Sequence, residues 1–132
     1  MSAGYRVLLA EDEVTFSKLL ARFLQERGHE VHACLTGKAA LGALEQREWD
    51  VVLLDLKLPD ANGVDILERL RREHEDLQTI ILTGFANVES AISTMRLGAF
   101  DYLTKPPNFE ELAVRVERAG EKTHLCCVAW AS

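Results

Sequence analysis

The sequence predicts an α/β fold in which helices cover both faces of one parallel sheet. Short apolar runs alternate along the chain with stretches of helical periodicity, which is typical of such doubly wound sheets. Four of the runs end at polar side chains, namely Glu11 with Asp12, Asp55, Thr83 and Lys105. Because the carboxyl ends of parallel strands lie along one edge of the sheet, we expect these side chains to meet in one crevice.

The first half of the chain contains the patterns of three strands and three helices. The strands are expected at 7–10, 30–34 and 51–54. Apolar residues at the spacing i, i+3, i+4, i+7 and i+8 indicate the first helix, which Gly28 terminates. Thr36 is a suitable N-cap for a second helix that ends near Gln46. The expected core-facing helical residues are Phe16, Leu19, Leu20, Phe23, Leu24, Leu41, Leu44, Ile66, Leu67 and Leu70.

The second half predicts two more strands, at 80–82 and 102–104, and two more helices. The fourth helix is expected to end before Gly98. Asn108, followed three residues later by Glu111, predicts a capping box at the start of the fifth helix. The apolar stripes are Val88, Ala91, Ile92 and Met95 on the fourth helix, and Phe109, Leu112, Ala113 and Val116 on the fifth.

Length and composition fit one folded domain. The chain has 132 residues, of which 48% are hydrophobic, and we expect a domain over residues 1–122. The helical pattern breaks at Thr123, so residues 123–132 are predicted to be a tail or linker stump. A formal net charge of -6 argues against direct nucleic-acid binding. Without a membrane-length apolar run or a signal-peptide core, a cytoplasmic protein is expected.

The acidic part of the predicted crevice favours a divalent cation. If Glu11, Asp12 and Asp55 converge, each pair of charges about 4 Å apart repels by roughly 4 kcal/mol, so the cluster needs a cation or protons. Mg²⁺ prefers oxygen ligands and tolerates a site with few protein ligands and an open position. With such an ion bound, one carboxylate can attack phosphorus and form an acyl phosphate.

The position of each residue in the sheet suggests its role. Asp55 follows the most apolar strand and is the predicted nucleophile, while Glu11 and Asp12 hold the metal ion. Lys105 and Thr83 supply an ammonium and a hydroxyl to the oxygens of the transferred phosphoryl group. Taken singly, each has an ordinary explanation. The acidic pair can stabilise a helix N-terminus, Asp55 can form a turn, Lys105 can be solvated, and Thr83 can be a plain strand-end hydroxyl.

Three segments resemble the receiver domain of bacterial two-component response regulators, and the match covers roughly residues 5–122. They are Leu-Ala-Glu-Asp-Glu at 9–13, Val-Val-Leu-Leu-Asp-Leu-Lys-Leu-Pro at 51–59 and Gly-Ala-Phe-Asp-Tyr-Leu-Thr-Lys-Pro at 98–106. The last segment is most similar to receivers of NtrC-type transcriptional activators. The resemblance implies a flavodoxin-like, CheY-like (βα)5 three-layer sandwich with strand order 2-1-3-4-5.

The resemblance also implies a function in a phosphorelay. Asp55 would accept a phosphoryl group from a sensor histidine kinase, and the main-chain carbonyl of Lys57 would join the metal ligands. Thr83 would be the switch hydroxyl, Tyr102 the switch aromatic and Lys105 the phosphate-contacting lysine. The peptide bond between Lys105 and Pro106 would be cis. The protein would be no enzyme beyond catalysing its own phosphorylation and dephosphorylation.

Phosphorylation is expected to draw the Thr83 hydroxyl inward and let Tyr102 turn from a half-exposed to a buried position. This would alter the face formed by the fourth helix, fifth strand and fifth helix, and so control a homodimer or an output domain absent from this chain. Tyr102 could instead be a plain half-buried strand residue. Charged residues on this face suit dimer salt bridges or a solvated surface: Glu89, Arg96, Arg115, Glu117 and Arg118.

Three alternative functions remain open. A stand-alone receiver would act through protein–protein contacts. A phosphatase with an aspartate nucleophile would be expected to carry a second Asp two residues after it, where this chain has Lys57. A flavin or nucleotide carrier would want a glycine-rich or hydroxyl-rich loop after the first strand, whereas Glu11 and Asp12 would repel phosphate.

Overall fold

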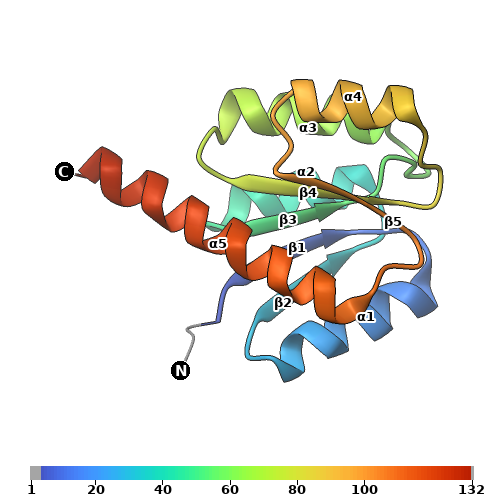
Figure 1. Cartoon of the computed structure of the whole chain (residues 1–132), viewed down its shortest axis with the longest axis horizontal. Helices are drawn as coiled ribbons and strands as arrows, with labels where there is room; N and C mark the ends of the chain where they lie inside the picture. The colour runs from blue at the N-terminus through green and yellow to red at the C-terminus, as the bar shows by residue number, and fades with distance from the viewer. Residues whose placement is uncertain (1–3, 132) are drawn as a thin grey trace.

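In the computed structural model, five parallel strands form one sheet between two layers of helices (Figure 1). The structure describes residues 4–131, and side chains as far as residue 125. The elements are β1 (Arg6–Ala10), α1 (Val14–Glu26), β2 (Glu30–Cys34), α2 (Gly37–Gln46), β3 (Val51–Leu54), α3 (Gly63–Glu73), β4 (Gln78–Thr83), α4 (Val88–Arg96), β5 (Asp101–Thr104) and α5 (Phe109–Ala131). The strand order β2-β1-β3-β4-β5 confirms the predicted topology.

Alternation along the strands divides the core into two halves. Leu8 and Ala10 of β1 face one half and Val7 and Leu9 face the other, as the two-residue period of a strand requires. In Figure 1, α1 and α5 lie against one face of the sheet, and α2, α3 and α4 lie against the other. The central strand β3 is buried along its whole length, which agrees with its uninterrupted apolar sequence.

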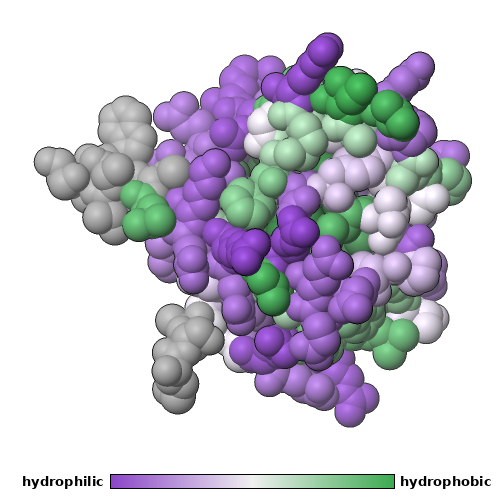
Figure 2. Space-filling view, viewed as in Figure 1, coloured by the Kyte–Doolittle hydropathy of each residue, from purple (hydrophilic) through white to green (hydrophobic). Residues whose placement is uncertain are grey.

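Two helices differ from their predicted faces. Leu19 belongs to the predicted stripe of α1, yet it is 56% exposed, whereas Leu20 and Leu24 are buried. On α4 most of the predicted stripe faces outward, with Val88 at 74% exposure. Figure 2 shows apolar side chains at the surface over this helix. The buried residue of α4 is Thr94, whose hydroxyl donates to carbonyl oxygens of its own preceding turn. A short polar side chain can therefore be the core-facing residue when the helix satisfies its hydroxyl.

The expected break in the fifth helix at Thr123 is wrong, because α5 continues to Ala131 and extends past the sheet in Figure 1. Thr123 is itself a buried anchor. Its hydroxyl donates to the main-chain oxygen of Asp50 at 2.6 Å and accepts from Gln78 N at 3.2 Å. The predicted domain boundary at residue 122 remains a prediction.

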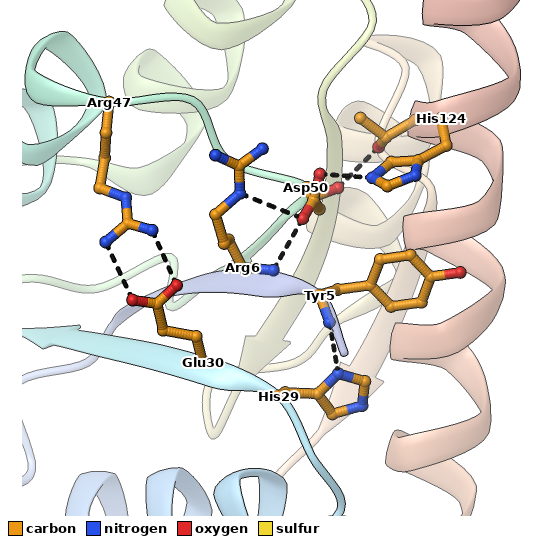
Figure 3. A network of polar contacts seen from close by, with 8 residues as sticks. Tyr5, Arg6, His29, Glu30, Arg47, Asp50 and His124 are labelled. Carbon is orange, nitrogen blue, oxygen red and sulfur yellow. Dashed lines mark hydrogen bonds and ion pairs between the residues drawn. The ribbon is translucent and has the colours of Figure 1, made fainter. Parts of the chain in front are cut away.

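Asp50 connects three elements at the amino-terminal edge of the sheet (Figure 3). Its carboxylate accepts from Arg6 N at 2.7 Å and contacts His124 Nε2 on α5 at 2.7 Å. Burial alone would raise the pKa of Asp50, but these hydrogen bonds outweigh it and hold the pKa below its usual value. This network fixes α5 against β1 and β3.

The charged residues predicted for the face of α4 and α5 are not all exposed. Glu89, Arg96 and Arg118 are exposed, whereas Arg115 and Glu117 are half-buried. Arg115 forms ion pairs with Asp101 at 2.5 Å and with Glu111 at 3.1 Å. Among the residues that the structure describes, no helix is long and apolar enough to cross a membrane.

Candidate functional site

The strand register brings the predicted site residues to one edge of the sheet. Ala10 pairs with Leu54, so the residues that follow them, Glu11 and Asp55, leave adjacent strands side by side. Thr83 is the last residue of β4 and pairs with Thr104, which directly precedes Lys105. The five predicted strand-end side chains therefore come from neighbouring strands in the order β1, β3, β4 and β5.

Lys105 connects the two buried carboxylates of the site. Its Nζ contacts Glu11 Oε1 and lies 2.8 Å from Asp55 Oδ2. The same nitrogen lies 5.1 Å from the ring centre of Phe16, within the range of a cation–π contact. Burial alone would lower the pKa of Lys105, but its bonds to Asp55 and Glu11 raise it above its usual value. With its side chain 20% exposed, Lys105 is a fixed cation rather than a freely solvated one.

Glu11 lacks a full set of partners. It is 1% exposed, and burial raises its pKa to about 7 although Lys105 opposes the shift. Its second oxygen, Oε2, is buried without a hydrogen-bond partner among the described residues. Each of Glu11, Asp12 and Asp55 offers an oxygen within 4.8 Å of the others. A buried carboxylate oxygen without a partner, beside two more carboxylates, fits a divalent cation with oxygen ligands.

The helix-dipole alternative for the acidic pair loses its basis because Glu13 caps α1. The Glu13 carboxylate accepts from Thr15 N at 3.1 Å and from Phe16 N at 3.0 Å. No acidic residue lies in the first turn of the helix itself. Glu11 and Asp12 are therefore not needed to stabilise the start of α1.

Asp55 combines the turn-forming role with a place in the site. Its Oδ1 accepts from Lys57 N at 3.1 Å, while its Oδ2 faces Lys105. A single antiparallel bridge joins Lys57 to Asn62 across the loop. Gly63 begins α3 so close to the backbone of Asp55 that a Cβ at this position would lie only 2.6 Å from Asp55 O. These contacts hold Lys57 N close to the Asp55 carboxylate and the start of α3 close to the backbone of Asp55 and Leu56.

Thr83 and Tyr102 lie on adjacent strands, but no hydrogen bond joins their side chains in the described structure. Thr83 is fully buried, and its Oγ1 accepts from Phe85 N at 3.1 Å. The half-buried Tyr102 directs its hydroxyl to Ser90 Oγ in the first turn of α4, at 2.5 Å. The predicted cis bond between Lys105 and Pro106 is present.

Sequence reasoning missed three side chains beside the site. Phe16 was assigned only to the core, although its ring also faces Lys105. Phe85 is 61% exposed and its ring centre lies 4.2 Å from Lys57 Nζ. Ser90 forms a capping box with Asn87 and contacts Tyr102. Only Ser90 left a signal in the sequence, namely a hydroxyl three residues after a helix-capping Asn.

Comparison with known proteins agrees with this geometry. The model of the response regulator receiver domain family matches residues 7–117. The chain is 34% identical over 90% of its length to the regulatory protein AtoC of Escherichia coli, and spans 26% of that protein. It is 40% identical over 86% of its length to the transcriptional regulatory protein TcrA of Mycobacterium tuberculosis, and spans 45% of it. The chain therefore covers less than half the length of these relatives.

A solved structure shows the same arrangement. The signal receiver domain of a putative LuxO repressor protein from Vibrio parahaemolyticus superposes with a TM-score of 0.89. The two are 28% identical, and the match covers 96% of this chain and 97% of that one.

This chain belongs to the response regulator receiver domain family, whose members serve in two-component phosphorelay signalling. The predicted similarity to receivers of NtrC-type transcriptional activators is confirmed.

Proposed function

We propose that this domain accepts a phosphoryl group on Asp55 from a sensor histidine kinase, in a reaction that depends on Mg²⁺. The observation that carries this proposal is that Lys105 contacts both Glu11 and Asp55, next to Glu11 Oε2, which has no hydrogen-bond partner among the described residues. A fixed ammonium and a carboxylate oxygen without a partner, both near Asp55, support its assignment as the nucleophile. An ordinary salt bridge would not require a buried carboxylate oxygen without a hydrogen-bond partner.

The residues present fit the metal ion that the family implies. Glu11, Asp12 and Asp55, together with the main-chain carbonyl of Lys57, would hold Mg²⁺. When bound, the ion supplies positive charge that offsets the carboxylates and stabilises the phosphoryl oxygens.

The protein's own residues would divide the remaining work. The Asp55 carboxylate attacks the phosphorus atom, and the phosphorus–nitrogen bond to the kinase histidine breaks, leaving an acyl phosphate on Asp55. Lys105 stays protonated beside Asp55 and neutralises charge on the phosphoryl oxygens. Thr83 has a hydroxyl one strand away that can be drawn toward the same oxygens. Water then hydrolyses the acyl phosphate, so the domain catalyses only changes to itself.

The response would travel to the face formed by α4, β5 and α5. Phosphate on Asp55 attracts the Thr83 hydroxyl, and Tyr102 turns inward into the vacated space. The exposed apolar side chains of α4, including Val88 and Ile92, support this face as the surface that a second copy or an output domain contacts. Because this chain covers 26% of AtoC and 45% of TcrA, control of a transcription-regulating output domain is the favoured role.

The phosphatase alternative has less support. The position two residues after Asp55 holds Lys57, whose ammonium lies over the Phe85 ring and offers no carboxylate for acid–base catalysis.

The test is incubation with acetyl phosphate and Mg²⁺, followed by intact-mass measurement. We expect a gain of one phosphoryl group that disappears when Mg²⁺ is chelated. Retention of the gain in Asp55→Asn would show that another residue is the nucleophile. Asp60→Asn is the matched control, because Asp60 lies in the same loop but accepts hydrogen bonds from Gly37 N and Lys38 N at the start of α2.

A further inference from the structure

The side-chain hydroxyl of Ser90 contacts the phenol of Tyr102. The Ser90 and Tyr102 oxygens are 2.5 Å apart, which joins β5 to the first turn of α4 across twelve residues of sequence. Both residues are half-buried, so the contact is neither freely solvated nor part of the sealed core. Ser90 lies one helical turn before Thr94, the buried residue of α4, and so shares its inward side.

The Ser90 hydroxyl has two polar contacts besides the phenol of Tyr102. Asn87 N donates to Ser90 Oγ at 3.4 Å, and Ser90 Oγ donates to Asn87 O at 3.1 Å. A serine hydroxyl has one proton and two acceptor positions. Either oxygen of the Ser90–Tyr102 pair can be the donor. With the Ser90 proton directed to Asn87 O, one acceptor position is left for the phenolic proton.

In this structure Tyr102 and Thr83 have different hydrogen-bond partners. Thr83 Oγ1 accepts from Phe85 N, and Tyr102 OH is directed to α4. An inward turn of Tyr102 that carries its phenol away from Ser90 would break this hydrogen bond. The start of α4 has a second hydrogen bond that does not involve the phenol, because the Asn87 side chain accepts from Ser90 N at 2.7 Å.

We propose that Ser90 is a positioning residue for Tyr102, whose hydroxyl retains the phenol against α4 and so opposes switching until Asp55 carries phosphate. The inference rests on the proposed function, since it assigns regulation to the same switch. Val88 and Ile92, two exposed apolar residues of α4, lie two positions before and two positions after Ser90 on that helix.

The experiment uses tyrosine labelled with ¹³C at the ε positions and NMR of the whole chain. The sequence has only two tyrosines, so Tyr5 serves as an internal reference while Tyr102 reports the switch. Phosphorylation with acetyl phosphate and Mg²⁺ defines the second signal position of Tyr102. Loss of one hydrogen bond is expected to shift the two-state equilibrium by about 2- to 12-fold. In unphosphorylated Ser90→Ala, the Tyr102 signal should therefore move toward the phosphorylated position.

Two further variants separate the hydroxyl from general damage to α4. Ser93→Ala is the matched control, because Ser93 is an exposed serine on the same helix, and its Tyr102 signal should stay at the wild-type position. Ser90→Thr keeps a hydroxyl and should restore that position. A Tyr102 signal that is unmoved in Ser90→Ala would overturn the proposal. A Ser90→Thr signal displaced as far as that of Ser90→Ala would overturn it as well, because the hydroxyl would then not be the cause.

The failure of this inference is distinguishable from failure of the proposed function. If Asp55 gains no phosphoryl mass, the proposed function fails, whatever the variants do to the Tyr102 signal. If Asp55 is phosphorylated but Ser90→Ala and Ser93→Ala have the same Tyr102 signal before phosphorylation, the function stands and the role of Ser90 is refuted.

Discussion

The two ends of strand β3 carry one buried aspartate each, and the two have opposite surroundings. Asp50, 5% exposed, precedes the strand, and Asp55, 4% exposed, follows it. At the amino end, Asp50 is bound by Arg6 N and His124, and its main-chain oxygen by Thr123. At the carboxyl end, Asp55 shares one lysine with Glu11, whose second oxygen has no partner within the described residues.

The comparison shows that burial of a carboxylate does not by itself indicate a reactive site. A carboxylate whose oxygens are satisfied by a main-chain N–H and by side chains stabilises the fold. Several carboxylates that compete for one cation leave charge and a ligand position unfilled, and such a cluster is suited to an ion and a reacting group.

The largest expected effect concerns Lys105. Lys105→Ala should slow phosphorylation by acetyl phosphate by about 100- to 1,000-fold, because it removes the fixed charge beside the phosphoryl oxygens. It should still accept phosphate and fail to switch, measured by intact mass against time and by the amide spectrum of α4. Lys18→Ala, at an exposed position on α1, is the control and should react at the wild-type rate. Equal phosphorylation rates for both variants would show that Lys105 has no role in the reaction.

The two ends should respond to pH with opposite signs. Burial raises the folded-state pKa of Glu11 to about 7, above the 4.5 of an ordinary glutamate, so the folded state binds the proton more tightly. Without Mg²⁺, this effect makes the free energy of unfolding decrease by up to about 3 kcal/mol as pH rises from 4.5 to 7. Glu11→Gln should lack this slope in urea titrations at several pH values. An unchanged slope would contradict the altered pKa.

Asp50 should show the reverse dependence. Its folded-state pKa lies below its usual value of 3.8, so its stabilisation is present above that pH and is lost as pH falls through the folded-state pKa.

At neutral pH, Asp50→Ala should lower the free energy of unfolding by about 2 kcal/mol, because Arg6 N loses its acceptor. Asp55→Ala should cost less than about 1 kcal/mol, since Lys105 keeps Glu11. Urea unfolding of Asp50→Ala and Asp55→Ala at pH 7 and pH 3 measures both losses of free energy of unfolding. Equal losses would contradict the structural role of Asp50 and the weaker structural role of Asp55.

The fold was predictable from sequence because its signals are repetitive. Alternating strands and helices, Gly28 at a positive φ after α1 and the caps at Thr36 and Asn108 all act locally, and the structure contains them. The outward stripe of α4 was not predictable, because periodicity identifies a face without saying which neighbour covers it. The helix through Thr123 was missed since its stabilising partner, Asp50, lies 73 residues earlier.

Placement of the site residues on one edge followed from the same strand pattern. The sequence could not show that Glu11 Oε2 has no hydrogen-bond partner among the described residues, or that the Asp50 carboxylate is fully hydrogen-bonded. Both features depend on contacts between residues far apart in the sequence. Residue type alone would have assigned Asp50 and Asp55 similar roles.

The smallest expected effect is on Mg²⁺ affinity, and it distinguishes the Glu11 cluster from a second carboxylate cluster. Glu11→Gln should weaken Mg²⁺ binding by about 10-fold, measured by isothermal titration calorimetry at pH 8, because it removes one charged ligand. Glu45, Glu73 and His74 form the other cluster, with ligand atoms within 4.8 Å of one another, but Glu73 already pairs with Arg69 at 3.0 Å. Glu45→Gln should leave Mg²⁺ affinity unchanged. A larger loss in Glu45→Gln would place the principal ion at the second cluster.

The most direct test of the central claim compares the two aspartates of β3 as phosphate acceptors. Wild type, Asp50→Asn and Asp55→Asn are each incubated with acetyl phosphate and Mg²⁺ at a temperature where all three are folded, and intact mass is measured. Wild type and Asp50→Asn should each gain one phosphoryl group and Asp55→Asn none. Undiminished labelling of Asp55→Asn, or its loss in folded Asp50→Asn alone, would contradict the assignment of the carboxyl edge as the reactive end.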